Sequence, residues 1–171
     1  MKKAIFIAGA AGLLLALTLV KTDYLTLRLP DSGNRIYFLG SMDPGERFSI
    51  TYRHSVEKTR VIGIFQISSQ PSVLAVETRM TSVGTGLPNT VSNRTTREGK
   101  WIVVDEQEKE IKGGFRFFIA SVNHTVLTTP GERIDLNQIP SGTVILVNAE
   151  RLALIHYLFY QWNKGINSRT I

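Results

Sequence analysis

The densest group of chemically useful side chains lies at residues 52–59, which read Tyr-Arg-His-Ser-Val-Glu-Lys-Thr. An imidazole, several hydroxyl groups, a carboxylate and two cations follow one another here. Because an arginine offers a planar pair of donors that suits a carboxylate or a phosphate, the segment predicts recognition of an anion. The alternative is structural: such charges are solvated, or pair with one another for less than about 1 kcal/mol.

His54 and Ser55 suggest nucleophilic catalysis, but neighbouring side chains on a strand point to opposite faces, so His54 is poorly placed to activate Ser55. A metal site could draw on His54, Glu57 and His124, yet the chain has no H-x-H or H-E-x-x-H spacing. We therefore predict no catalytic residue, no metal and no cofactor, and expect a protein that is not an enzyme. A metal-dependent enzyme that uses these three residues is the alternative.

Residues 84–88 read Gly-Thr-Gly-Leu-Pro, a loop that can present main-chain amides to a ligand. It lacks the lysine and the following helix of a phosphate-binding loop, so nucleotide binding is a poor match, and a purely structural turn is the alternative. Taken together, the residues predicted to bind a ligand are Tyr52, Arg53, His54, Ser55, Glu57, Lys58, Thr59, Gly84, Thr85, Gly86 and His124.

The elements that must position these residues are mostly strands. From Tyr24 onward, apolar residues recur with period two between turn residues, which predicts an all-β domain: an antiparallel sandwich or barrel of about eight or nine strands. If the third strand stays extended, His54 shares a face with Ile50 and Tyr52. Residues 105–110 are predicted as a charged turn. The expected strands are 25–29, 35–39, 47–52, 61–67, 73–80, 101–104, 115–119, 125–128 and 143–147.

A helix is predicted to begin at Glu150 and to end near Trp162, because this stretch has no glycine or proline and Lys164-Gly165 follows it. It either packs on the protein's own sheet or rests its aromatic end on a membrane interface or a partner. The expected organisation is a signal-anchor helix at 1–21, a β domain at 22–149, and a C-terminal helix and tail at 150–171.

Lys2 and Lys3 precede an uncharged run that begins at Ala4 and ends at Val20, which predicts export. The run ends in bulky residues where signal peptidase favours small ones, so we expect an uncleaved membrane anchor at the inner membrane, with cleavage as the alternative. The rest of the chain would face the periplasm or the extracellular side.

The chain has no cysteine, which excludes disulfides, thiolate metal sites and a lipid-modified cysteine. Its formal charge of +6 comes from scattered cations without a basic stripe, so nucleic acid is not expected as a partner. An anionic solute or an anionic membrane surface fits that charge better.

The 52–59 and 84–88 strings, together with Asn123-His124-Thr125, resemble a bacterial family of domains of unknown function, the one numbered 1850, over about residues 24–147. Members are typically short exported or anchored proteins, often encoded beside TAXI-type TRAP transporters. The resemblance implies an extracytoplasmic accessory or binding protein for a solute transporter, which contacts a membrane subunit or an anionic solute. A cell-envelope assembly factor without a small-molecule site is a further alternative.

Overall fold

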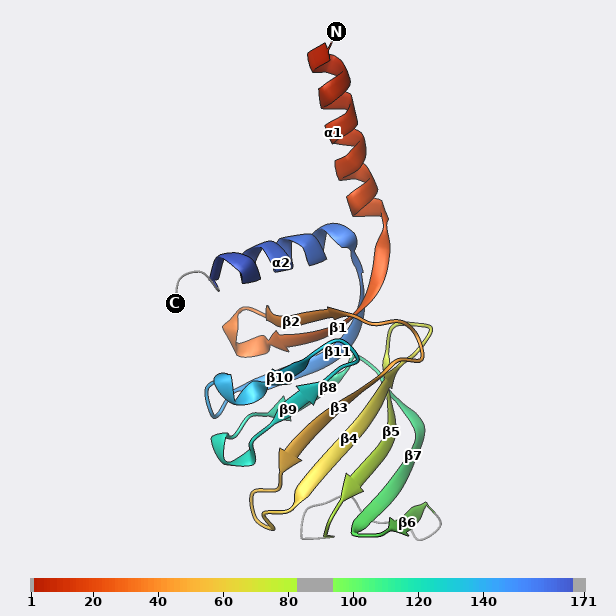
Figure 1. Ribbon diagram of the computed structural model, residues 1–171, viewed down its shortest axis with the longest axis vertical. Helices are drawn as coiled ribbons and strands as arrows, with labels where there is room; N and C mark the ends of the chain where they lie inside the picture. The colour runs from red at the N-terminus through yellow and green to blue at the C-terminus, as the bar shows by residue number, and fades with distance from the viewer. Residues whose placement is uncertain (1, 83–93, 168–171) are drawn as a thin grey trace.

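The computed structural model describes residues 2–82 and 94–167, and within them it has two antiparallel sheets, eleven strands and two α-helices (Figure 1). The four-stranded sheet contains, in spatial order, β2 (Arg35–Ser41), β1 (Lys21–Leu29), β11 (Val144–Ala153) and β8 (Phe115–Phe118). The seven-stranded sheet contains β10 (Arg133–Asp135), β9 (Val126–Thr128), β3 (Arg47–Arg53), β4 (Arg60–Ile67), β5 (Val73–Met80), β7 (Trp101–Ile111) and β6 (Thr95–Glu98). The predicted mainly β fold is confirmed, with more strands than expected and without closure into a barrel.

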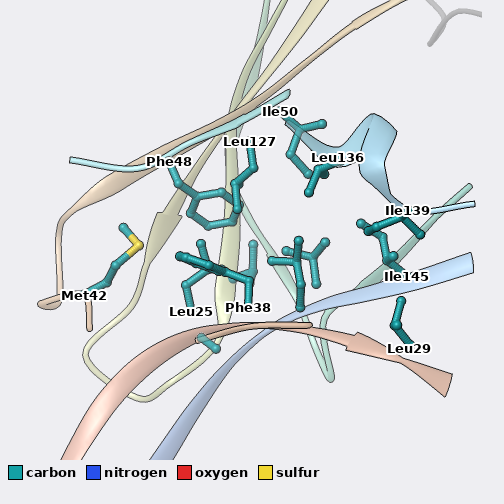
Figure 2. Close-up of a cluster of buried hydrophobic side chains, with 14 of the residues drawn as sticks. Leu25, Leu29, Phe38, Met42, Phe48, Ile50, Leu127, Leu136, Ile139 and Ile145 are labelled. Atoms are coloured by element: carbon teal, nitrogen blue, oxygen red, sulfur yellow. The ribbon is translucent and has the colours of Figure 1, made fainter. Parts of the chain in front are cut away.

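One hydrophobic core joins the two sheets (Figure 2). Leu25 and Leu27 of β1 meet Phe48 and Ile50 of β3 in this core, and all four side chains are almost fully buried. The period-two alternation of both strands places these side chains on one face, and each contributes about 1.5–3 kcal/mol by leaving water. The shared core therefore fixes how the two sheets, and with them the loops at their strand ends, lie relative to each other.

The predicted charged turn at residues 105–110 is wrong, because β7 runs on as a strand to Ile111. The pairing with β5 shifts register between Ala75 and Glu77, and Gln107 and Glu108 have positive φ values of 57° and 50°. A bulge thus absorbs extra residues without ending the strand; most of the charged side chains are exposed, and Glu106 accepts a hydrogen bond from the Thr78 hydroxyl at 2.9 Å. The prediction also missed β6 and β10, which are too short and polar to show a clear alternation.

The predicted helix start at Glu150 is also wrong, because β11 continues to Ala153 and α2 spans Leu154–Asn167. Glu150 lies opposite Tyr24 of β1 and receives hydrogen bonds from Arg28 Nε and Nη2, both at 2.7 Å. These long-range partners hold the segment in the sheet, although its sequence alone favours a helix.

The two helices leave the four-stranded sheet at neighbouring strand ends. Helix α1 (Lys2–Leu19) projects away from the sheets, whereas α2 lies across the outer face of β1 and β2 (Figure 1). Tyr157 of α2 stacks on Tyr24 at 5.5 Å, and Tyr160 Oη donates to the Tyr37 carbonyl at 3.2 Å. This contact confirms that α2 packs on its own sheet.

Within residues 2–82 and 94–167, no helix is long and apolar enough to cross a membrane.

Candidate functional site

The predicted site at residues 52–59 forms the end of β3 and the hairpin turn into β4. Arg53 pairs with Arg60 as the last strand position, and the His54 N–H donates to the Thr59 carbonyl at 2.8 Å. The Lys58 N–H donates back to the His54 carbonyl at 2.9 Å. The strand ends at Arg53 and His54 opens a turn, so the alternation that would place His54 on the face of Ile50 and Tyr52 does not apply.

The hairpin turn uses many of its polar groups to hold its own main chain. His54 Nδ1 accepts from the Glu57 N–H at 3.2 Å, and Arg53 Nε donates to the Lys58 carbonyl at 3.0 Å. Ser55 and Lys58 have the S-x-x-K spacing of a catalytic serine–lysine pair. Here, however, Lys58 Nζ donates to the main-chain oxygen of Ser55. These contacts favour the structural interpretation of the turn.

His124 reaches the same end of the seven-stranded sheet from a different loop. It follows η2 (Ser121–Asn123) with a φ of 46°, and it precedes β9, whose Val126 pairs with Thr51 of β3. Its side chain is exposed, and in the described part of the chain no hydrogen bond or ion pair joins it to His54. In the residues that the structure describes, no group of three histidine, aspartate or glutamate side chains could hold a metal ion.

Tyr52 and Thr59 are built into the protein behind this turn. Tyr52 packs edge-on against Phe117, with ring centroids 5.4 Å apart, and burial raises the pKa of its hydroxyl. Thr59 Oγ1 is buried and has no hydrogen-bond partner among the described residues, as is also true of the Thr125 hydroxyl. Gly84, Thr85 and Gly86 lie outside the described residues.

A concave feature lies elsewhere, between α2 and β2. This α2–β2 groove has a volume of about 930 Å³. Its walls are aliphatic and aromatic, its rim carries an arginine, a histidine and a lysine, and no carboxylate lines it. The lining residues are Arg35, Ile36, Tyr37, Gln138, Ile155, His156, Phe159, Tyr160, Asn163 and Lys164.

A smaller cavity of about 260 Å³ adjoins the groove and shares four lining residues with it: Tyr37, Gln138, Tyr160 and Lys164. It adds the carboxylates of Glu132 and Asp135, and Lys164 Nζ lies 3.6 Å from Glu132 Oε2. The acidic groups are thus confined to one end, and Lys164 is partly neutralised there. The other end keeps its positive charge.

The phenol groups of the groove stay protonated at neutral pH. Burial raises the pKa of Tyr37 and, as the largest of several effects, also raises the pKa of Tyr160. Both hydroxyls are therefore neutral hydrogen-bonding groups beside an apolar wall.

Sequence reasoning missed this groove because its walls come from residues 35–37 and 155–164, which only the tertiary fold brings together. The aromatic end of the C-terminal helix was the one available signal. Nothing in the local pattern around Arg35 distinguishes it from an ordinary strand-end cation.

Comparison with protein families places the hairpin turn inside a known family region. The family described as "Domain of unknown function (DUF1850)" matches residues 48–136, just over half of the 171-residue chain. That interval includes His54 and His124, whereas all ten residues that line the α2–β2 groove lie outside it. No curated protein and no solved structure matches the chain. The chain belongs to the DUF1850 family.

Proposed function

We propose that this protein is an extracytoplasmic, membrane-attached accessory protein of a TRAP-type solute transporter, and that it binds an anionic solute with an apolar part in the α2–β2 groove. The observation that carries the proposal is the composition of the groove. Arg35, His156 and Lys164 border aromatic walls, and none of the ten lining residues is acidic.

The groove chemistry favours a carboxylate attached to a short apolar body. Arg35 offers a planar fork of donors to a carboxylate, while Ile155 and Phe159 offer apolar surface to the rest of the molecule. The volume of about 930 Å³ lies within the range of small-molecule sites, roughly 300–1,000 Å³. A small organic acid fits both conditions better than a bare inorganic anion does.

The transport setting rests on the resemblance to proteins encoded beside TAXI-type transporters, and the location rests on the export signal formed by the N-terminal lysines and the apolar run. Binding in the groove is compatible with the structure of the hairpin turn, where the His54 and Lys58 side chains hold the main chain of the turn itself. Attachment to the membrane through the apolar run is part of the proposal.

Thermal unfolding of the full chain with a panel of mono- and dicarboxylates of graded chain length tests the binding role. A bound acid raises the unfolding midpoint, and Arg35→Gln is expected to abolish that increase. Arg53→Gln, a matched change in the hairpin turn, should leave the increase intact. If Arg53→Gln abolishes binding and Arg35→Gln does not, the site is the hairpin turn and the groove assignment is wrong.

The transporter role needs a separate measurement. Deletion of the gene should reduce uptake of the acid that binds, and the protein should co-purify from native membranes with a transporter subunit. Normal uptake together with no transporter subunit in the purified material would contradict this role.

A further inference from the structure

Helix α2 turns an apolar stripe away from its own domain. Leu158, Phe159 and Trp162 are 46%, 67% and 69% exposed, and with Ile155 they follow the i, i+3, i+4, i+7 spacing of one helix face. Tyr157 points to the opposite side, where it stacks on Tyr24. The more apolar face is thus the one that the fold leaves in solvent. We call these four residues the outer stripe; Ile155 is half-buried, and Ile155 and Phe159 also line the edge of the α2–β2 groove.

The outer stripe begins where α1 ends. Lys21 of β1 pairs with Ala153 of β11, and the Leu154 N–H donates to the Val20 carbonyl at 2.9 Å. Leu19 and Val20 are themselves exposed. Figure 1 shows α1 rising from this junction on the side of α2 that faces away from the sheets. The exposed apolar surface therefore continues from one helix to the other.

The charges around the stripe favour an anionic surface. Residues 154–164 contain no acidic side chain, and Lys164, which pairs with Glu132 of a neighbouring loop, is exposed on α2. Lys21 at the junction adds another exposed cation. A tryptophan and a phenylalanine on an apolar face, bordered by cations, are typical of helices that lie in the headgroup region of a bilayer.

We propose that the outer stripe docks on the surface of an anionic lipid bilayer, with α2 lying in the interface and α1 entering the lipid beside it. A bilayer suits both helices because it receives one helix along its surface and another that points into it. The inference goes beyond the solute-binding role, since Leu158 and Trp162 do not line the groove.

Trp162 fluorescence in the full chain tests the docking. The chain has two tryptophans, so Trp101→Phe leaves Trp162 as the reporter. On vesicles of phosphatidylcholine and phosphatidylglycerol, we expect its emission to shift to the blue, acrylamide to quench it less, and brominated lipids to quench it. Vesicles of phosphatidylcholine alone should give weaker protection, and equal protection would overturn the preference for anionic lipid.

Leu158→Ser in the Trp101→Phe background should lower the equilibrium constant for docking of α2 on vesicles by about tenfold, because one leucine side chain no longer enters the lipid. Val56→Ser is the matched control, since Val56 is 68% exposed on the β3–β4 hairpin at the far end of the molecule (Figure 1). It should leave Trp162 protected.

Two results would overturn the proposal. In the first, Trp162 stays as accessible to acrylamide on vesicles as in buffer. In the second, protection arises without lipid and grows with protein concentration, which would assign the stripe to a second copy of the chain. Arg35→Gln should abolish acid binding and leave Trp162 protected, so failure of the solute site and failure of docking are distinguishable.

Discussion

The turn between β7 and β8 offers a sharp test of the packing of the four-stranded sheet. Gly113 and Gly114 have nearly equal positive φ values of 74° and 78°. A Cβ atom at residue 114 would lie 2.2 Å from the Val147 carbonyl oxygen and 2.8 Å from Asn148 Cβ, whereas one at residue 113 would meet nothing within 4 Å. Alanine at either position therefore incurs the same cost of left-handed backbone, and only alanine at residue 114 adds a steric clash.

The magnitude follows from these two terms. Left-handed backbone costs an L-residue about 1–2 kcal/mol, and the restricted unfolded chain offsets about 0.4–1 kcal/mol, so Gly113→Ala should destabilise by about 1 kcal/mol. Gly114→Ala must also move β8 away from β11, which breaks main-chain pairing around Val147 and costs about 2 kcal/mol more.

Urea unfolding of the full chain, followed by far-ultraviolet circular dichroism, measures both free energies under one condition. Gly114→Ala should lose about 3 kcal/mol, or fail to fold while Gly113→Ala folds. Equal losses in the two variants would refute the reasoning, because they would show that the close approach to Val147 has no energetic consequence.

Three further predictions concern single contacts. Glu150→Gln should lower the free energy of unfolding by about 1.5–3 kcal/mol near neutral pH, since the Arg28–Glu150 pair is only about one-fifth exposed. The hydrogen bonds from Arg28 hold the pKa of Glu150 below its ordinary 4.5, so this stability is complete above that pH and is lost as the pH falls through the lower folded pKa. Urea titrations should therefore show wild type and variant converging in acid, and a constant gap would contradict the pair. Tyr157→Leu removes a stacked contact with Tyr24 worth about 0.5–1.5 kcal/mol and should speed hydrogen exchange along α2; unchanged exchange would show that the stack does not hold the helix. His54→Ala should cost less than about 1 kcal/mol and leave carboxylate binding unchanged in the thermal assay, and loss of binding would return His54 to the ligand site.

Local alternation was sufficient to predict the strands whose two faces differ in burial. The predicted bounds of β5, residues 73–80, are those observed, and the first four strands differ mainly by extension at their ends. In β1 and β3 alternate side chains enter the shared core, Leu25 and Leu27 from one strand and Phe48 and Ile50 from the other, so the sequence records the burial directly. The β1–β2, β2–β3 and β4–β5 turns carry glycine, proline or aspartate, which marks the strand ends, whereas the β3–β4 turn at residues 54–59 carries none of the three.

The failures occur where distant partners decide the structure. Glu150 has neighbours that favour a helix, but the Arg28 guanidinium, 122 residues away, keeps it in a strand. The charged segment of β7 resembles a turn because its outer face is solvated and its bulge is invisible in the alternation. Local propensity cannot anticipate either contact.

The candidate site could be predicted only in part for the same reason. The hairpin turn and His124 lie at the same end of the seven-stranded sheet, as the pairing of β3 with β9 requires. The sequence does not show which polar side chains bond to the turn's own main chain, because the hydrogen bond between His54 Nδ1 and the Glu57 N–H forms only once the turn closes. The α2–β2 groove needs the complete four-stranded sheet before it exists.

The place of β11 between β1 and β8 has a consequence for how this chain is made. Strand β1 emerges first during synthesis, yet its partner residues around Arg151 emerge more than a hundred residues later. Until then, β1 and β2 present Leu25 and Phe38 without the neighbour that completes their sheet. A polypeptide with such non-local pairing folds slowly and exposes apolar surface until β11 is made, which makes a holding chaperone useful during synthesis. A fragment trimmed to the family region, residues 48–136, would lack β1, β2 and β11 permanently and should aggregate when expressed alone.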